Sequence, residues 1–158
     1  MSEKSPLNLV LYSPEIPQNT GNISRTCAVT GARLHIIKPI GFEISDRTLK
    51  RAGLDYWDKL DVTYYDSYDD FVTKNKNAEI YYFTSHTTRS FASVDYPDGA
   101  YLMFGCESVG LPRSLVEANP DRAVRIPMRG TLRCLNLSNA VAVAAYEYLR
   151  QKSYPDLV

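Results

Sequence analysis

The segment Leu7–Ile37 reads LNLVLYSPEIPQNTGNISRTCAVTGARLHII and carries a strand–helix–strand pattern. Leu7–Tyr12 and Arg33–Ile37 are short apolar runs typical of buried strands, whereas Asn19–Thr30 between them has helical character. Gly31, directly after the helical stretch, is a typical C-terminal stop for a helix. A helix between two buried strands predicts a crossover connection, and such connections join parallel strands.

The same alternation continues toward the C-terminus. Further stretches with a buried-strand pattern are Val62–Tyr65, Glu79–Thr84, Tyr101–Phe104 and Ala123–Ile126. Short helices are expected at Asp46–Ala52 and Asp69–Lys76, and a longer one begins at Leu137. We therefore predict an α/β fold, with a mainly parallel sheet that carries helices on both faces, in a single domain spanning residues 1–158.

Length and composition exclude several classes of protein. The chain has 158 residues, which is enough for one buried core but short of the ~250 residues of a TIM barrel. No run approaches the ~20 apolar residues of a membrane span, and the start lacks the apolar core of a signal peptide, so we expect no membrane association. The three cysteines are far apart, and neither they nor the two histidines have a metal-site spacing. We expect a cytoplasmic protein without disulfides or metal.

The last predicted helix is apolar on two sides. Its main stripe recurs at three- and four-residue steps and consists of Leu137, Ala140, Val141, Ala144, Ala145, Tyr148 and Leu149. The opposite face would be polar on an ordinary surface helix, but here it contains Ala142, Val143 and Tyr146. The helix is either fully buried within its own domain or covered by a second chain. We favour the second alternative and predict a homodimer.

Three polar segments each follow a predicted strand. They are Pro14–Arg25 (PEIPQNTGNISR), Phe104–Pro112 (FGCESVGLP) and Arg125–Asn139 (RIPMRGTLRCLNLSN). In the first, Asn19 and Asn22 lie at a helix start, where free N–H groups favour an anion. In the second, Gly105 permits close backbone approach to a ligand. Each segment also has a purely local explanation. Asn19 or Asn22 could cap the first helix, Asn136, Ser138 or Asn139 could cap the last one, and the glycines could form ordinary turns.

The zero net charge of the chain conceals an uneven distribution. Between Arg113 and Arg133 two acids, Glu117 and Asp121, stand against five arginines: Arg113, Arg122, Arg125, Arg129 and Arg133. A basic end of this kind is suited to phosphate groups. The glycine-rich signatures of dinucleotide folds and P-loops are missing from the sequence, which argues against a metabolic enzyme for a small phosphorylated substrate.

Taken together, the three segments resemble the three motifs of the SpoU branch of the SPOUT superfamily of RNA ribose 2′-O-methyltransferases. The matching residues are Asn19, Gly21, Asn22 and Arg25, then Gly105, Glu107 and Gly110, then Ile126, Pro127, Met128, Asn136, Leu137, Ser138 and Asn139. The resemblance covers Leu7 to Leu149. The stretches PEIPQNTGNISR, GFEISDRTLKRAGLDYWD and YLMFGCESVGLP are most similar to the compact bacterial enzymes that methylate the wobble ribose of leucine tRNAs.

The resemblance implies a C-terminal trefoil knot and a site for S-adenosylmethionine, without a metal. By position, the cofactor-binding residues would be Phe83, Thr84, Gly105, Ile126, Pro127, Met128, Cys134 and Leu135. Cys134 stands where the family commonly has serine, and a thiol is a weak hydrogen-bonding group, so a side-chain contact there is in doubt.

The resemblance also implies the catalytic residues and the partner. Arg25 would be the main catalytic residue, and Asn19 and Glu107 would position it and the ribose. Because a guanidinium group stays protonated far above neutral pH, we expect Arg25 to clamp a phosphate rather than act as the base. Asn136 would fix the third segment, and contacts to the anticodon stem-loop of a tRNA would come from Asn22, Arg129, Arg133, Ser138 and Tyr146.

Two alternatives to a wobble-nucleotide enzyme follow from the same resemblance. The protein could methylate a different RNA site, since specificity depends on surface shape. It could also be a non-catalytic RNA-binding dimer that kept the fold, but the presence of Asn19, Arg25 and Glu107 argues against that alternative.

Overall fold

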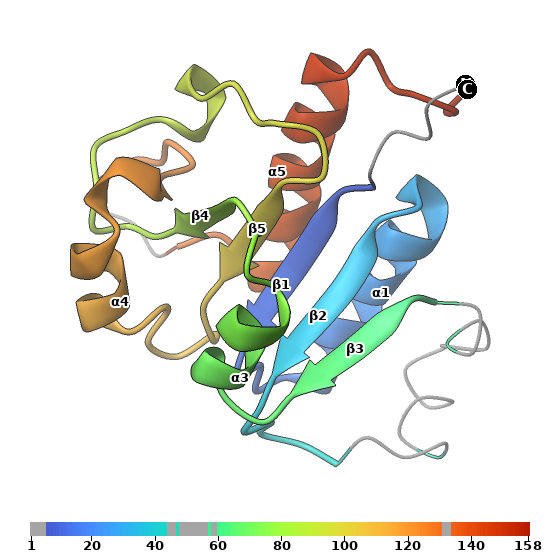
Figure 1. Ribbon diagram of the computed structural model, residues 1–158, viewed down its shortest axis with the longest axis vertical. Coiled ribbons are helices and arrows are strands. Elements are labelled where there is room, and N and C mark those ends of the chain that lie inside the picture. The colour runs from blue at the N-terminus through green and yellow to red at the C-terminus, as the bar shows by residue number, and fades with distance from the viewer. Residues whose placement is uncertain (1–5, 44–46, 48–56, 58–59, 131–133) are drawn as a thin grey trace.

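The protein forms an open sheet of six parallel strands in a computed structural model that describes residues 6–43, 47, 57, 60–130 and 134–158 (Figure 1). The strand order across the sheet is β3-β2-β1-β5-β4-β6. The strands are β1 (Asn8–Tyr12), β2 (Arg33–Ile37), β3 (Val62–Tyr65), β4 (Ile80–Phe83), β5 (Tyr101–Phe104) and β6 (Ala123–Val124). The predicted strands are therefore confirmed, with ends that differ by one or two residues, and so is the parallel arrangement.

The helices cover both faces of the sheet, as the alternation predicts. They are α1 (Pro17–Thr30), α3 (Tyr68–Lys74), α4 (Arg113–Ala118) and α5 (Leu137–Gln151), with short 3₁₀ turns η2 (Phe91–Ser93) and η3 (Pro120–Arg122). Figure 1 shows α1 and α5 behind the sheet and α3 in front of it. The helix predicted at Asp46–Ala52 lies outside the described residues, apart from Arg47.

Alternate side chains of each strand enter two separate cores, as the period of two in a strand requires. In β1, Leu9 and Leu11 pack with residues of α1 and α5, whereas Val10 points to the other face. There Val10 joins Phe71 of α3 and Val116 of α4. Apart from the edge strand β3, the strands are mostly buried on both sides, which explains why they read as continuous apolar runs.

Helix α5 buries one apolar side and exposes the other. Val141, Ala144, Ala145, Tyr148 and Leu149 are buried against the sheet and α1, as the stripe predicts. On the opposite side Val143 is 44% exposed and Tyr146 is 45% exposed. The chain therefore leaves one side of α5 exposed, and the alternative that this helix is fully buried within its own domain is wrong.

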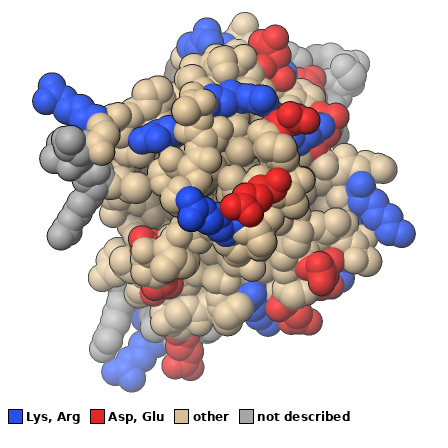
Figure 2. All heavy atoms as spheres, turned by 90° about the vertical axis from the view of Figure 1, so that its left-hand side faces the viewer, with Lys and Arg blue, Asp and Glu red and all other residues tan. Residues whose placement is uncertain are grey.

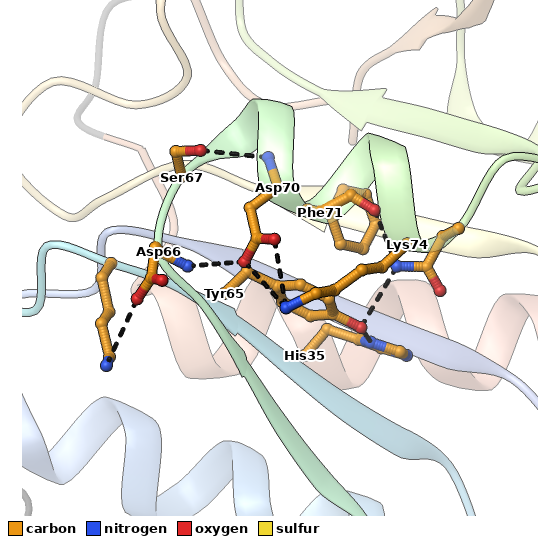
Figure 3. Close-up of polar contacts among 9 residues, drawn as sticks. His35, Tyr65, Asp66, Ser67, Asp70, Phe71 and Lys74 are labelled. Carbon is orange, nitrogen blue, oxygen red and sulfur yellow. Dashed lines mark hydrogen bonds and ion pairs between the residues drawn. The ribbon is translucent and has the colours of Figure 1, made fainter.

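The buried side chain of His35, on β2, forms polar contacts with residues of the neighbouring strands β1 and β3. Figure 3 shows the contact with Tyr65 of β3. The ring nitrogens of His35 lie 2.8 Å from the Tyr65 hydroxyl and 2.9 Å from Asn8 Oδ1. The Tyr65 oxygen also accepts from Asn75 Nδ2, and Tyr101 donates to Asn75 Oδ1. His35 is thus a structural residue. The same view shows the start of α3, where Ser67 Oγ accepts from the backbone N–H of Asp70.

This buried histidine makes the stability of the fold depend on pH. Burial lowers the pKa of His35 from 6.5 to about 4. Because the unfolded chain then binds a proton more readily than the folded one, stability is full above pH 6.5 and is lost as the pH falls toward 4. At pH 4.5 the loss should be about 2 to 3 kcal/mol. Urea denaturation at pH 7.5 and 4.5 measures it, and His35→Gln should flatten this dependence. An equal pH dependence in both proteins would contradict the assignment.

Candidate active site

The three polar segments meet at the carboxyl edge of the sheet. Phe83 is in register with both Phe104 and Val124, so the loops that begin at Thr84, Gly105 and Arg125 lie side by side. Strand β1 pairs with β5 up to Leu11 and Phe104, which brings the segment after β1 to the same edge. Ligands of open parallel sheets bind in the crevice outside this edge. The placement of the candidate site therefore follows from strand register.

Helix α1 is capped by a carboxylate that comes from another loop. The helix begins at Pro17, and its N-cap residue, Ile16, has no side-chain cap of its own. Instead, Glu107 accepts hydrogen bonds from the N–H groups of Glu15 and Ile16, at 2.8 and 3.2 Å. A negative charge is favourable at this end of a helix. The prediction that Asn19 or Asn22 caps the helix is wrong, because both lie inside it.

Asn19 takes part in the same contact. It is buried, and its Nδ2 donates to Glu107 Oε1 at 3.3 Å, so the structure joins two predicted site residues from different segments. Glu107 therefore has three donors around its carboxylate, all from residues 15–19. This arrangement fixes where α1 starts relative to the loop after β5.

A second carboxylate, that of Glu15, connects the same two segments in the opposite direction. Glu15 Oε1 accepts from the backbone N–H of Ser108 at 3.2 Å and from the Ser108 hydroxyl at 2.6 Å. Hydrogen bonds from Cys106 and Ser108 lower the pKa of Glu15 below its usual value, so it is ionised at neutral pH. Neither Glu15 nor Ser108 is among the residues predicted from the sequence. Each lies within a segment singled out there, but no spacing pattern joins residues 93 positions apart.

The loop after β5 folds back on itself, and this requires Gly105. A Cβ atom at Gly105 would lie 2.0 Å from the Gly110 carbonyl carbon and the Leu111 nitrogen. Gly110 has a left-handed φ of +72°, and its N–H donates to the Cys106 carbonyl at 3.0 Å. The side of Gly105 on which a Cβ atom would project is thus filled by its own loop, and the approach of a ligand to the backbone of this loop stays a prediction.

The predicted cofactor residues divide into a buried group and an accessible group. Phe83 is buried and stacks on Phe104 at 4.6 Å, while the N–H of Thr84 donates to the Val124 carbonyl. Ile126 and Met128 are half-buried, and the other accessible members, Pro127, Cys134 and Leu135, are exposed. Accessible apolar side chains beside open backbone loops fit the faces and edge of an adenine ring. Residues of the third segment therefore have the chemistry that S-adenosylmethionine needs.

Arg25 is an exposed residue of α1 and lies further along the helix than the residues that contact Glu107. Arg25 and Asn22 are both exposed, which agrees with the common helix face that their three-residue spacing predicts. Arg25 follows Asn19 by six positions, which corresponds to about 9 Å along a helix. Arg25 is thus accessible to a ligand that approaches the surface of α1.

The third segment ends in a side-chain cap for α5. Asn136 Oδ1 accepts from the N–H groups of Ser138 and Asn139, at 2.9 and 3.4 Å, which confirms the predicted cap. The Ser138 hydroxyl also donates to Asn136 Oδ1 at 2.6 Å, and Ser138 is buried. Ser138 therefore stabilises the helix start and does not present its hydroxyl to an RNA. Arg129 is exposed, and Arg133 lies outside the described residues.

The predicted basic end of the molecule carries both signs of charge. Figure 2 shows Lys and Arg side chains interspersed with Asp and Glu on the side that carries α4. Arg113 lies 4.0 Å from Glu117, Arg125 donates to the Ser85 carbonyl, and the Arg122 guanidinium lies over the Tyr81 ring. Several of these arginines are thus engaged within the chain, which leaves fewer of them for phosphate than their number suggests.

The described ranges hold neither a metal site nor a membrane span. No cluster of three or more His, Cys, Asp or Glu side chains suited to a metal ion occurs in them. None of the helices in the described part of the chain is both long and apolar enough to cross a membrane.

Comparison with known proteins gives one consistent result. Residues 6–146 match the SpoU rRNA Methylase family. The chain is 50% identical over 153 residues to the tRNA (cytidine(34)-2′-O)-methyltransferase of Escherichia coli strain K12, covering 96% of this chain and 98% of that protein. The protein of the same name from Yersinia pestis is 45% identical over 155 residues, covering 94% and 96%.

A solved structure gives the same result for the fold. It comes from work on the 2-OH methylation of C/U34 on tRNA and is 45% identical, with a TM-score of 0.87, covering 94% of this chain and 97% of that one. The resemblance noted in the sequence is therefore confirmed across nearly the whole chain. The protein belongs to the SpoU rRNA Methylase family and is a methyltransferase of the SpoU type.

Proposed function

We propose that the protein transfers a methyl group from S-adenosylmethionine to the ribose 2′-oxygen of the wobble nucleotide, cytidine or uridine, of leucine tRNAs. The observation that carries this proposal is the meeting of the three segments at one edge of the sheet, in a chain half identical to a tRNA (cytidine(34)-2′-O)-methyltransferase. Such an enzyme would act in the cytoplasm, where tRNA is found.

The cofactor would be held by the loops after β4, β5 and β6. Ile126, Met128 and Leu135 would enclose the adenine, and backbone groups near Gly105 would contact its edge. Cys134 is exposed and could take part through its backbone. When bound, S-adenosylmethionine supplies an activated methyl group on a sulfonium. We propose that the third segment passes through the trefoil knot of this family, which would make these loops rigid.

The residues of the chain would align the attacking ribose. Arg25 would bind the phosphate next to the target nucleotide and so orient the 2′-hydroxyl for in-line attack. Asn22, Arg129, Arg133 and Tyr146 would add contacts to the anticodon stem-loop. Glu107 and Asn19 would act indirectly, by fixing the start of the helix that carries Arg25.

A second copy of the chain would cover the exposed side of α5 and form a homodimer. The outer side of α5 exposes Val143 and Tyr146 and carries small alanines, which let another helix approach closely. We expect Ala142→Asp combined with Val143→Asp to give a folded monomer without methyltransferase activity, because burial of unpaired charge is costly. Light scattering measures the mass. Val72→Asp, at a similarly exposed valine on α3, is the matched control and should leave the wild-type mass unchanged. An unchanged mass in the double variant would rule out this interface.

The function is tested by incubating purified protein with labelled S-adenosylmethionine and total tRNA, followed by nucleoside mapping. Label in 2′-O-methylcytidine or 2′-O-methyluridine at position 34 of leucine tRNAs is the expected result. Label at another position would show a different RNA target. Tight tRNA binding without transfer of label would favour the non-catalytic alternative.

A further inference from the structure

Two glutamates connect the start of α1 and the loop after β5 in opposite directions. Glu107, from the loop, accepts from the N–H groups of Glu15 and Ile16 ahead of the helix. Glu15, from the helix side, accepts from the N–H and hydroxyl of Ser108 in the loop. Each segment thus supplies the acceptor for backbone N–H groups of the other. We call this pair of contacts the Glu15–Glu107 lock.

The lock is a better constraint than either contact alone. A single hydrogen-bonded carboxylate leaves a hinge between two loops, whereas two contacts in opposite directions fix both their separation and their relative rotation. The acceptor of each bond is a carboxylate, and the shortest bond in each direction is 2.8 Å from the Glu15 N–H and 2.6 Å from the Ser108 hydroxyl. Gly41 also packs closely here, since a Cβ atom on it would lie 2.9 Å from the Glu15 Cα.

The two locked segments hold different partners in the proposed reaction. The loop that starts at Gly105 belongs to the cofactor side, and α1 carries Arg25 on the RNA side. Methyl transfer needs the donor carbon and the attacking oxygen in line, and a misplacement of ~1 Å can lower the rate ~100-fold. A constraint between these segments therefore acts on alignment, while each ligand keeps its own local contacts.

We propose that Glu15 is a positioning residue for methyl transfer, which holds the cofactor loop and the catalytic helix in register through Ser108. This proposal rests on the proposed function. Glu15 would affect the rate of methyl transfer once both ligands are bound. It would not affect the binding of S-adenosylmethionine or of tRNA. Glu107 is the other half of the same device, and Glu15 is the half that can be removed without uncapping α1.

The test compares Glu15→Ala with Glu15→Gln, which keeps a hydrogen-bond acceptor. For Glu15→Ala we expect kcat with tRNA to fall ~30- to 100-fold, while KM for each substrate changes less than ~3-fold. Glu15→Gln should recover most of the lost rate, and Ser108→Ala, which keeps the backbone donor, should lose ~3- to 10-fold. Glu79→Ala, an exposed glutamate before β4 at the other edge of the sheet, is the matched control and should match wild type.

A second measurement tests the contacts of the Glu15–Glu107 lock independently of enzymatic activity. Amide hydrogen exchange at Ser108 should be at least ~10-fold faster in Glu15→Ala than in wild type, with exchange in the strands unchanged. Wild-type kcat in Glu15→Ala, or a rise in KM that accounts for the whole loss, would overturn the proposal. Unchanged exchange at Ser108 would overturn it as well. If wild-type protein methylates no tRNA, the proposed function fails, and the exchange result still decides whether the lock exists.

Discussion

Replacing Arg25 with alanine is expected to lower the rate of methyl transfer to tRNA by roughly 100- to 1,000-fold. Arg25 is exposed and lies six residues after Asn19 on α1, so its removal should leave the Asn19–Glu107 hydrogen bond at the helix start in place. The affinity for S-adenosylmethionine should stay within about 3-fold of wild type, because the cofactor loops follow β4, β5 and β6. Single-turnover kinetics with saturating cofactor measure the first effect, and calorimetry measures the second.

Two control variants sharpen the result for Arg25. Arg33→Ala removes an exposed arginine that pairs with Asp61 at the amino-terminal edge of the sheet, and it should retain wild-type activity. Arg25→Lys keeps the charge but loses the planar group that binds phosphate through two parallel bonds, so it should recover only part of the rate. If Arg25→Ala methylates tRNA at the wild-type rate, Arg25 has no catalytic role.

Replacing Gly105 with valine is expected to abolish cofactor binding and to destabilise the protein. Even a Cβ atom would lie 2.0 Å from two backbone atoms of the same loop, and no rotation of a side chain relieves such an overlap. The loop must open, which should weaken S-adenosylmethionine binding at least ~100-fold and lower the free energy of unfolding by about 3 kcal/mol. Calorimetry and urea denaturation measure the two effects.

The control for Gly105 is a glycine whose side chain would have room. Gly31 ends α1 with a φ of +78°, and a Cβ atom added to it would have no neighbouring atom within 4 Å. Gly31→Ala should therefore cost about 1 to 2 kcal/mol through backbone strain alone and leave cofactor binding unchanged. Wild-type affinity in Gly105→Val would show that the loop after β5 does not contribute to the cofactor site.

The strands, most of the helices and the parallel pairing of the strands could be predicted from the amino-acid sequence. Buried parallel strands must be apolar on both faces, so Leu7–Tyr12, Tyr101–Phe104 and their counterparts stand out from the polar connections between them. Gly31 and Asn136 were likewise readable, because a helix end and a helix cap depend on residues within a few positions of each other. The three polar segments stand out for the same reason, since each is a short motif after a strand.

The contacts that these residues make depend on the folded arrangement of the chain. Asn19 and Glu107 are 88 positions apart in the chain, and Glu15 and Ser108 are 93 apart, so their hydrogen bonds exist only because β1 and β5 are neighbours in the sheet. The role of Gly105 was also invisible in the sequence, since a glycine that accommodates a ligand and one that accommodates its own loop look identical. A sequence pattern reflects interactions between residues that are close in the chain. A site built from several strand ends depends instead on the order of the strands in the sheet.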